Sequence, residues 1–450
     1  MTPRNPVYPG RRPRPTWPCQ SLFILLLAVL LLGTNPAPAL TADSADAVFS
    51  DVRPALLQIR TVVGPGEQQS SIGSGFLVSA DGLAITNYHV VAQHALEPGT
   101  YRLQYREPDD SRGDLELLAI DVLSDLAVVR RTREAPVFLE FDALALTDDT
   151  PRGERLFAIG NPMDIGFTIV EGTHNGLVER SFLERIHFSG ALNAGMSGGP
   201  ALTRDRRIAG VNVARMGGGQ LISFLVPPGK ALALLDQARN GQPMSLDVVK
   251  EEIARQVLRW QKDLFEQLDA APRKPLQMGR YRISEPDLPW LSCWAGTNRH
   301  SRPRPRVHVD TTRCSNQSQL FIDSQLSTGA YSLVHSHVIN QDLNTVQFAR
   351  HLSNLYAPEA RMHFQGARRL TAARCHDDFV SSAVAGPELR VLWCARAYRE
   401  FDDIFDIDVA VVTQDSSAEA LVSRLEMKGV SWETGTDQVR RLIEDVQWAM

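Results

Sequence analysis

The sequence predicts an all-β barrel or sandwich domain, followed by a long helix and an α+β domain. Three observations support this order of parts. Short apolar runs separated by Gly, Pro and Asp turns fill residues 55–226, apolar residues recur every three or four positions over residues 245–269, and the remainder mixes strand-like and helix-like stretches. A chain of 450 residues has room for two or three domains, each with its own core.

The β-rich part is predicted from runs of alternating or continuous apolar residues that end at turn signals such as Gly64-Pro65-Gly66 and Asp81-Gly82. A helix over Lys230–Arg239, ending near Asn240-Gly241, would close this domain. The expected strands lie at Leu56–Ile59, Ser74–Val78, Leu83–Thr86, Leu115–Val122, Leu126–Val129, Leu156–Ile159, Thr168–Val170, Ile208–Val213 and Ile222–Val226.

The second half is predicted to begin with a packing helix over residues 245–269, because its polar face carries both charge signs. Four prolines from Pro272 to Pro289 then indicate a linker or the entrance to the next domain. Ser416 and Glu419 form a capping box that predicts a helix over 416–428, and a further helix is expected from Thr436. Strands are expected at Ala330–Ile339, Arg390–Cys394 and Phe405–Val412.

The first 39 residues have the order of a secretory signal peptide. Four arginines precede the apolar run Leu22–Leu32, and Ala37-Pro38-Ala39 follows as a small-residue cleavage site. Eleven apolar residues in a helix would cover about half of a bilayer core, which favours a cleaved signal over an inner-membrane signal-anchor, the alternative. The sequence therefore predicts export to the periplasm or the extracellular space.

Charge and cysteine content after this cut restrict the function further. Removing residues 1–39 takes away four arginines and no acidic residue, leaving 43 basic and 52 acidic residues and a formal charge of −9, which disfavours a nucleic-acid partner. The four remaining cysteines are even in number and lack C-x-x-C spacing, so disulfides are expected rather than zinc. Of three possible pairings, Cys293–Cys314 with Cys375–Cys394 closes the shortest loops. No metal or cofactor is expected.

The stretch Asn193–Pro200 carries one serine among three glycines. Glycines beside Ser197 let the backbone turn tightly and bring N–H groups close to a reacting carbonyl oxygen, which acyl-transfer chemistry requires, although the same run could be an ordinary flexible loop. Ser197 needs a base and an orienting carboxylate. His89, at the end of a strand, and Asp125, directly before a buried strand, are the best candidates, with His94 as the competing histidine.

Five blocks resemble, in order, the motifs of chymotrypsin-fold serine proteases of the HtrA (Deg) type. The blocks are Ser74-Gly75-Phe76-Leu77-Val78, Thr86-Asn87-Tyr88-His89-Val90-Val91, Ser124-Asp125-Leu126-Ala127-Val128, Ala158-Ile159-Gly160-Asn161-Pro162 and Gly195-Met196-Ser197-Gly198-Gly199-Pro200. The resemblance implies a double β-barrel with His89 as general base, Asp125 as its orienter and Ser197 as nucleophile. The backbone N–H groups of Gly195 and Ser197 would form the oxyanion hole.

The resemblance also implies a substrate site. Ala191 and Leu192 would stand at the base of the specificity pocket, and because neither is acidic, cleavage after small or medium aliphatic residues is expected. The stretch Leu221, Ile222 and Ser223 would form the wall along which the substrate adds as an antiparallel strand.

Two departures from the HtrA pattern matter. Met196 stands where the family usually has asparagine, so a side-chain hydrogen bond cannot hold the loop and the oxyanion hole is expected to be less well formed at rest. HtrA proteins usually carry PDZ domains after the protease, and residues 245–450 show no Gly-Leu-Gly-Phe-like carboxylate-binding loop. Regulation and substrate presentation therefore do not carry over from the family.

The predicted organisation is a signal peptide at 1–39, a trypsin-like serine protease domain at 40–243, a helical linker at 244–285 and an α+β domain of unknown role at 286–450. The predicted function is that of an exported serine endopeptidase acting through an acyl-enzyme. The alternative is a non-catalytic peptide-binding or scaffold protein of the cell envelope. The expected partners are polypeptides such as unfolded envelope proteins; membrane contact would occur only through an uncleaved signal, and an oligomer is compatible with the sequence.

Overall fold

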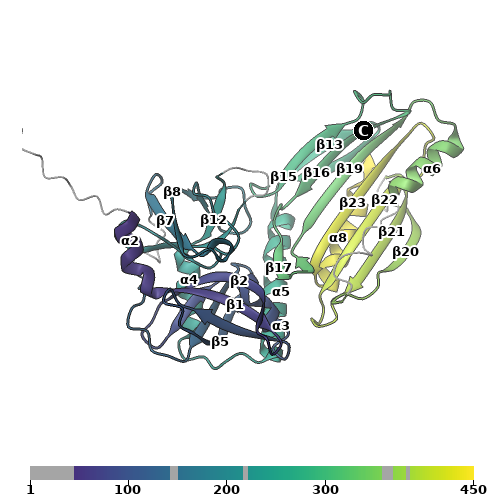
Figure 1. Cartoon of the computed structure of the whole chain (residues 1–450). Helices are drawn as coiled ribbons and strands as arrows, with labels where there is room; N and C mark the ends of the chain where they lie inside the picture. The colour runs from purple at the N-terminus through teal and green to yellow at the C-terminus, as the bar shows by residue number, and fades with distance from the viewer. Residues whose placement is uncertain (1–44, 142–149, 216–220, 357–367, 382–385, 450) are drawn as a thin grey trace, which may run out of the picture. The chain divides into compact units, whose positions relative to one another are not determined.

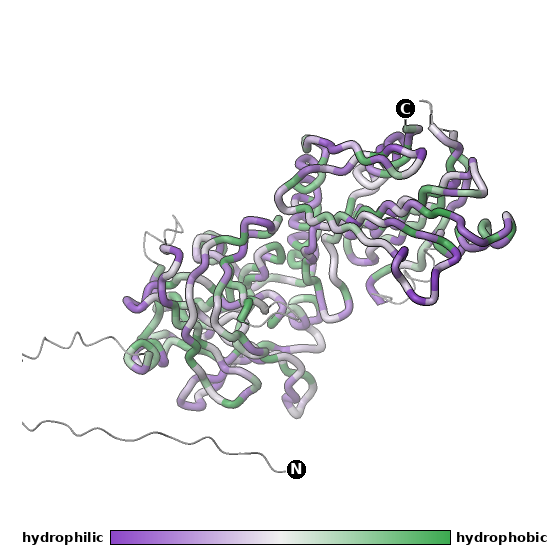
Figure 2. Tube along the Cα trace, turned by 90° about the horizontal axis from the view of Figure 1, so that it is seen from above, coloured by the Kyte–Doolittle hydropathy of each residue, from purple (hydrophilic) through white to green (hydrophobic). Residues whose placement is uncertain are grey.

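The computed structural model describes residues 45–141, 150–215, 221–356, 368–381 and 386–449 (Figure 1). The chain from Ala45 to Met450 forms one compact unit. The expected signal segment, residues 1–39, lies outside the described residues. Hydrophobic and hydrophilic residues are mixed along the whole chain trace (Figure 2). In strands such as Tyr331–Asn340, buried and half-buried residues alternate, which is the pattern of a strand with one buried face.

Two closed six-stranded β-barrels follow the short helix α2 (Ala45–Val52), which confirms the predicted double-barrel fold. The first barrel has the strand order β1-β2-β3-β6-β5-β4 and the second the order β10-β11-β12-β9-β8-β7. The first contains β1 (Leu56–Val63), β2 (Gln68–Leu77), β3 (Leu83–Thr86), β4 (Tyr101–Arg106), β5 (Arg112–Asp121) and β6 (Leu126–Arg131). The second contains β7 (Arg155–Gly160), β8 (Thr168–Leu177), β9 (Ile186–Phe188), β10 (Pro200–Leu202), β11 (Ile208–Arg215) and β12 (Ser223–Val226).

Helix α4 (Pro228–Ala238) closes the barrel region where a helix was predicted, and helix α5 (Leu246–Ala270) follows it. The buried face of α5 carries Gln256, which lies against the first barrel. Its Nε2 donates to the carbonyl of Ile120 at 2.8 Å, and its Oε1 accepts from the N–H of Val122 at 2.7 Å. Because both of its polar ends are satisfied by backbone of the first barrel, this buried amide ties α5 to that barrel.

The C-terminal region is built on a seven-stranded sheet in the order β15-β16-β19-β23-β22-β21-β20, which confirms the α+β prediction. Its strands are β15 (Ser292–Thr297), β16 (Val307–Ser315), β19 (Tyr331–Asn340), β20 (Arg374–Ser381), β21 (Glu388–Ala397), β22 (Phe405–Thr413) and β23 (Glu419–Val430). Alternate residues of its central strands face opposite ways. One set packs with α5 and α8 (Trp432–Asp445), and the other with α6 (Thr345–Tyr356).

Two local predictions for this region are wrong. The segment 416–428 is not a helix, because β23 lies between β19 and β22 and pairs with both. The linker expected up to residue 285 is helical only along α5; β13 (Arg273–Met278) and β14 (Tyr281–Pro286) form a hairpin, whose second strand pairs with β24 (Gln447–Trp448).

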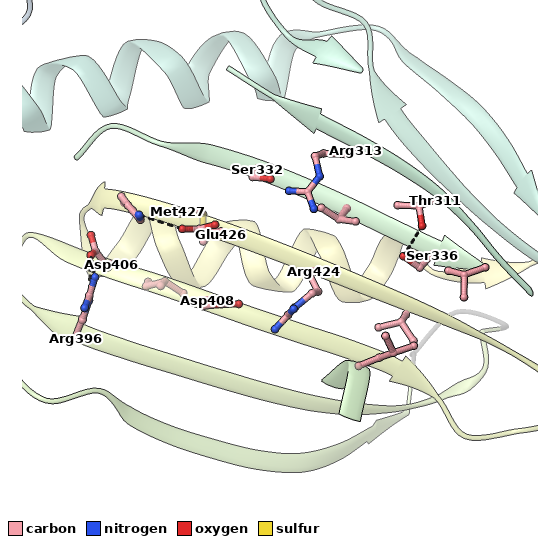
Figure 3. Close-up of a pocket in the computed structure, with 16 residues that line it drawn as sticks. Thr311, Arg313, Ser332, Ser336, Arg396, Asp406, Asp408, Arg424, Glu426 and Met427 are labelled. Carbon is pink, nitrogen blue, oxygen red and sulfur yellow. Dashed lines mark hydrogen bonds and ion pairs between the residues drawn. The ribbon is translucent and has the colours of Figure 1, made fainter. Parts of the chain in front are cut away.

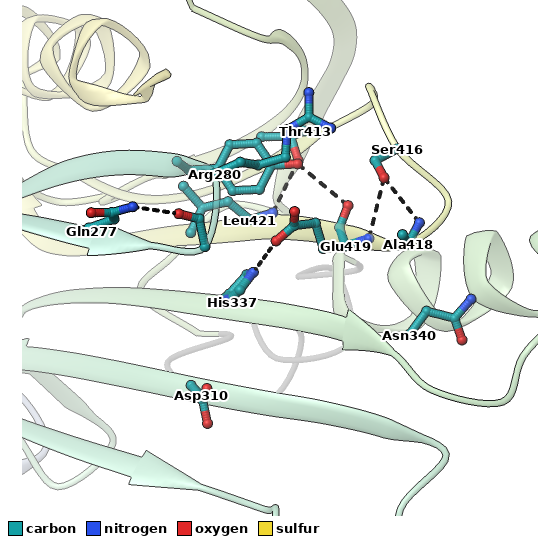
Figure 4. A network of polar contacts seen from close by, with 12 residues as sticks. Gln277, Arg280, Asp310, His337, Asn340, Thr413, Ser416, Ala418, Glu419 and Leu421 are labelled. Atoms are coloured by element: carbon teal, nitrogen blue, oxygen red, sulfur yellow. Dashed lines mark hydrogen bonds and ion pairs between the residues drawn. The ribbon is translucent and has the colours of Figure 1, made fainter. Parts of the chain in front are cut away.

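Polar contacts attach this hairpin to the large sheet (Figure 4). Tyr281 Oη donates to the carboxylate of Asp415 at 2.9 Å and accepts from Thr413 Oγ1 at 3.1 Å. His337 Nε2 lies 2.6 Å from Glu419 Oε2, and any side chain at Gly279 would collide with both of those side chains. The prolines of this segment therefore accompany a packed hairpin rather than a free linker.

The four cysteines form the pairs Cys293–Cys314 and Cys375–Cys394, the pairing preferred from the sequence. Each disulfide joins directly opposite residues of neighbouring strands, β15 with β16 and β20 with β21. Since β15 and β20 are the two edge strands, each edge of the open sheet is covalently attached to its neighbour.

Candidate active site

His89 and Asp125 meet at the rim of the first barrel. His89 lies in the first turn of α3 (Tyr88–Leu96), and Asp125 occupies the turn between β5 and β6 with a positive φ of 58°, a conformation that aspartate tolerates. Asp125 Oδ2 accepts from His89 Nδ1 at 2.7 Å, and Oδ1 accepts from the His89 backbone N–H at 2.9 Å. Asn87 Nδ2 donates to the backbone carbonyl of Asp125 at 2.7 Å, so the turn and the helix start are fixed together.

These contacts change the acid–base behaviour of His89. Burial on its own would lower the pKa of this imidazole, but the negative charge of Asp125 and its hydrogen bond favour the protonated ring, and the pKa lies above its ordinary value. With Nδ1 occupied by Asp125, the other ring nitrogen, Nε2, is the one left to take up a proton. The competing histidine, His94, is engaged elsewhere, because its Nδ1 lies 2.8 Å from the carbonyl of Tyr101.

Ser197 lies in the loop between β9 and β10, and tight contacts hold that loop against the start of α3. The N–H of Ser74 donates to the carbonyl of Ser197 at 2.7 Å. A side chain on Gly198 would meet Ser74, Thr86 Oγ1 and the N–H of Asn87, two residues before His89, within 3 Å. Gly198 has a φ of +85°, so both space and conformation require glycine here. Ser197 Oγ donates to the carbonyl of Val213 at 3.4 Å.

Two carbonyl groups near Ser197, those of Ala194 and Met196, each accept a hydrogen bond from a backbone N–H group. The carbonyl of Ala194 accepts from the N–H of Met163 at 2.9 Å, and that of Met196 accepts from the N–H of Gly199 at 3.1 Å. In a trans peptide the N–H points opposite to the carbonyl, so the N–H groups of Gly195 and Ser197 point away from these partners. Within the described residues neither of these two N–H groups donates a hydrogen bond.

Met196 anchors the loop by packing instead of by a hydrogen bond. Its side chain is fully buried inside the second barrel, in a cluster with Leu156, Phe188 and Leu225. Ser74 adds the polar contacts that Met196 cannot make, since its Oγ donates to the carbonyl of Gly195 at 2.7 Å and accepts from the N–H of Asn161 at 2.9 Å. The loop is therefore held at rest, contrary to the expectation based on Met196 alone.

The sequence did not single out two side chains that support this loop. Ser74 lies in an expected strand and in the first HtrA-like block, and Asn212 lies in the expected strand Ile208–Val213, but neither position alone indicates a contact with the Ser197 loop. Asn212 Nδ2 donates to the carbonyls of Ile159 at 3.0 Å and Met196 at 3.3 Å. Buried polar residues in strands were the available signal, because such groups need partners in the fold.

The residues expected to bind substrate divide into two groups. Leu192 is buried, and its N–H donates to Ser223 Oγ at 3.3 Å, whereas Ala191 is exposed. The prediction that Ser223 forms a wall for substrate docking is wrong. This residue pairs with β11 on one side and with β9 on the other, so β12 has no free edge there; Leu221 is 60% exposed and, like Ile222, precedes the strand.

The open edge next to Ser197 belongs to β11 instead. Strand β10 pairs with β11 only as far as Val211, and in the described part of the chain no strand continues that edge along residues 213–215. Because the carbonyl of Val213 already contacts Ser197 Oγ, this edge runs directly beside the serine.

Away from these residues, a hollow lies on the face of the seven-stranded sheet (Figure 3) and has a volume of about 440 Å³. Its charged side chains include the pairs Arg396–Asp406 at 2.8 Å and Lys428–Glu426 at 3.3 Å. Hydroxyl groups are present, but no histidine is among its lining residues. None of His89, Asp125 and Ser197 lines this hollow.

Residues 73–211 match the family model described as "Trypsin-like peptidase domain". Together with the two closed barrels, this match defines a chymotrypsin-fold serine protease domain. The curated relatives that match this region are named as proteases of the HTRA and DegP-like type. "Serine protease HTRA1" of Xenopus tropicalis is 30% identical over 186 residues, 39% of this chain and 38% of the relative. A "Probable periplasmic serine endoprotease DegP-like" of Hahella chejuensis is 32% identical over 185 residues, 39% of this chain and 37% of the relative.

Among solved structures, the serine endoprotease from Yersinia pestis is 21% identical and covers 44% of this chain and 67% of its own length, with a TM-score of 0.37. The chain spans about two fifths of the length of the curated relatives it matches. The similarity to these relatives concerns the protease domain, and the fold assignment rests on the barrels and the family match.

Proposed function

We propose that this protein is a serine endopeptidase in which His89, Asp125 and Ser197 form the catalytic triad. The observation that carries the proposal is the double hydrogen bond of His89 to Asp125, beside a serine held on a glycine-rich loop. A serine hydroxyl is a weak nucleophile unless a base takes its proton, and a neutral imidazole fixed by a carboxylate is suited to that task. The domain boundaries at residues 40 and 243 remain part of this proposal.

The chemistry follows from these roles. Ser197 Oγ attacks the carbonyl carbon of the scissile bond while its proton moves to His89 Nε2. His89 then gives that proton to the departing amine, which leaves an acyl group on Ser197. A water molecule, deprotonated by His89, attacks the acyl group and releases the new carboxyl end. Throughout the cycle Asp125 stabilises the imidazolium and holds the ring in one orientation.

The N–H groups of Gly195 and Ser197 are proposed to bind the negative oxygen of the tetrahedral intermediate. Support comes from their lack of acceptors within the described residues and from the fixed carbonyls of Ala194 and Met196. Donors that are already oriented cost no rearrangement when charge develops, and the loss of one such donor typically costs about 100-fold or more in kcat.

We propose that a substrate adds as a strand to the open edge at residues 213–215 and places a small or medium aliphatic side chain near Leu192. Main-chain hydrogen bonds along a strand edge give affinity without regard to sequence, and the pocket then selects one side chain. Neither Ala191 nor Leu192 offers a counter-charge for arginine or lysine. A peptide-library digest dominated by cleavage after Arg or Lys would contradict this preference.

Export is proposed from the signal-like residues 1–39 and from the two disulfides, which persist in oxidising compartments. Within the described residues, no helix is both long and apolar enough to cross a membrane.

The proposal is tested by incubating the oxidised chain without residues 1–39, and its Ser197→Ala variant, with unfolded casein. The wild type should degrade casein, and the variant should lose activity by several orders of magnitude while keeping the same unfolding midpoint. Equal inertness of both proteins, with binding of casein retained, would favour the non-catalytic peptide-binding alternative. Equal activity of both would show that Ser197 is not the nucleophile.

A further inference from the structure

A small hairpin from the C-terminal region reaches the first turn of α3. It consists of β17 (Leu320–Asp323) and β18 (Leu326–Thr328) and is separate from the large sheet. Leu320 and Ile322 are 1% exposed, so successive side chains of β17 point in opposite directions, and Phe321 and Asp323 share the other face. This second face is the one that lies along α3.

Phe321 packs against the imidazole of His89. The two ring centroids are 6.0 Å apart with an interplanar angle of 76°, an edge-to-face arrangement that is favourable between aromatic rings. The ring of the preceding residue, Tyr88, lies 6.4 Å from that of Phe321, and its hydroxyl donates to the carbonyl of Ile322 at 2.9 Å. Tyr88 is fully buried. Two successive residues of α3 are thus held by two successive residues of β17.

A buried ion cluster attaches the same hairpin to the other end of α3. Arg369, whose side chain is 6% exposed, pairs with Asp323 on the hairpin and with Glu400. It also lies 3.2 Å from Glu97, the residue that directly follows α3. Because the buried guanidinium pairs with a carboxylate of the hairpin and with one at the end of α3, it links the hairpin to α3.

We propose that Phe321 is a positioning residue for His89, so that the appended C-terminal region completes the protease active site. This inference rests on the proposed triad. Asp125 fixes the imidazole through Nδ1, but a single hydrogen bond leaves the ring free to tilt about that contact. The ring of Phe321 packs against the imidazole of His89 and limits this tilt, which keeps Nε2 directed at the Ser197 loop.

The test compares Phe321→Ala with Phe321→Tyr and with the matched control Phe379→Ala. Phe379 is 59% exposed on β20 and has no part in the site. On one peptide substrate, Phe321→Ala should lower kcat by about tenfold or more with KM changed less than about twofold, because misplacement of a catalytic group affects the chemical step. Phe321→Tyr should restore most of the rate, and Phe379→Ala should match the wild type.

An NMR measurement separates this inference from the proposed function. The proton between His89 Nδ1 and Asp125 should give a downfield signal in the wild type that broadens or disappears in Phe321→Ala and persists in Phe321→Tyr and Phe379→Ala. This readout needs no turnover, so it decides the inference even if the wild type is inactive. If Phe321→Ala does not fold, Phe321→Leu replaces it. Unchanged kcat and an unchanged signal in a folded variant without the ring would overturn the proposal.

Discussion

The two barrels and the seven-stranded sheet are both antiparallel, but they are stabilised in different ways. Each barrel is closed by its ring of strand pairs, although β11 keeps a short unpaired stretch at residues 213–215, and the barrel loops are held by backbone hydrogen bonds and glycine contacts. The sheet is open, and a disulfide attaches each of its edge strands to the next. Strand closure therefore stabilises the barrels that carry the proposed active site, whereas the appended sheet depends on disulfides and buried charges.

The largest expected effect concerns a single hydrogen bond in the barrels. Asp125→Asn should reduce kcat by about 10⁴-fold with little change in stability, because the amide favours the wrong imidazole tautomer. In the wild type, activity should fall with decreasing pH around a value above 6.5, since the pKa of His89 is raised; in the variant this limb should shift to lower pH. The exposed Asp114→Asn serves as control in the same pH-dependent assay. A similar rate for both variants would remove Asp125 from the triad.

The seven-stranded sheet is expected to lose stability at low pH, because it contains a buried histidine. Burial lowers the pKa of His335 from 6.5 to about 3, and its Nδ1 lies 2.8 Å from Ser423 Oγ. The unfolded chain takes up this proton near pH 6.5, so His335 contributes to stability above that pH. This contribution is lost as pH falls from 6.5 towards 3.

Urea unfolding measured across this pH range tests the effect of His335. His335→Gln should flatten the slope of unfolding free energy against pH, and the exposed control His376→Gln should not. An unchanged slope in His335→Gln would mean that other groups cause the loss of stability in acid.

Removal of Arg369 should weaken the junction between the barrels and the C-terminal region, whereas removal of its neighbour Arg368 should have little effect. Arg369→Met leaves Asp323, Glu400 and Glu97 without their shared partner and should cost about 3 kcal/mol of unfolding free energy. Arg368 also contacts Glu97, at 3.0 Å, but its side chain is 68% exposed, so Arg368→Met should cost less than about 1 kcal/mol. Equal effects of the two substitutions on denaturant midpoints would contradict the buried-cluster interpretation.

The smallest effect on stability is expected from removing the disulfide at one edge of the seven-stranded sheet. The double variant Cys375→Ala and Cys394→Ala should lower the unfolding free energy by about 2 kcal/mol, because the disulfide restricts a loop with a sequence separation of 19 residues. Casein degradation at 25 °C should stay close to wild type, since this edge makes none of the active-site contacts described above. A loss of activity as large as the loss from Phe321→Ala would mean that the whole sheet, and not the hairpin alone, supports His89.

The sequence was sufficient for the parts of the fold that local pattern controls. Short strands before residue 226 and the spacing of apolar residues along α5 identified the barrels and the helix. The proposed triad could be predicted because three chemical roles and five ordered blocks converge on His89, Asp125 and Ser197.

The features that the sequence does not predict depend on contacts between distant parts of the chain. Ser416 does make the predicted contact with the N–H of Glu419, at 3.4 Å, but the residues that follow form a central strand because β19 and β22 offer pairing on both sides. Tertiary pairing thus outweighed a local helix signal. The contact of Phe321 with His89 joins residues more than 200 positions apart, and no periodicity in either segment reports it.

Ser197 is proposed to be an activated nucleophile, and covalent labelling of its hydroxyl tests this role most directly. A fluorophosphonate should modify the oxidised full chain, and mass spectrometry should find the adduct on the peptide that contains Ser197. The same adduct should be absent from Ser197→Ala and strongly reduced in a His89→Ala variant that keeps the wild-type unfolding midpoint. An unlabelled wild type, or an adduct on another residue, would contradict the account.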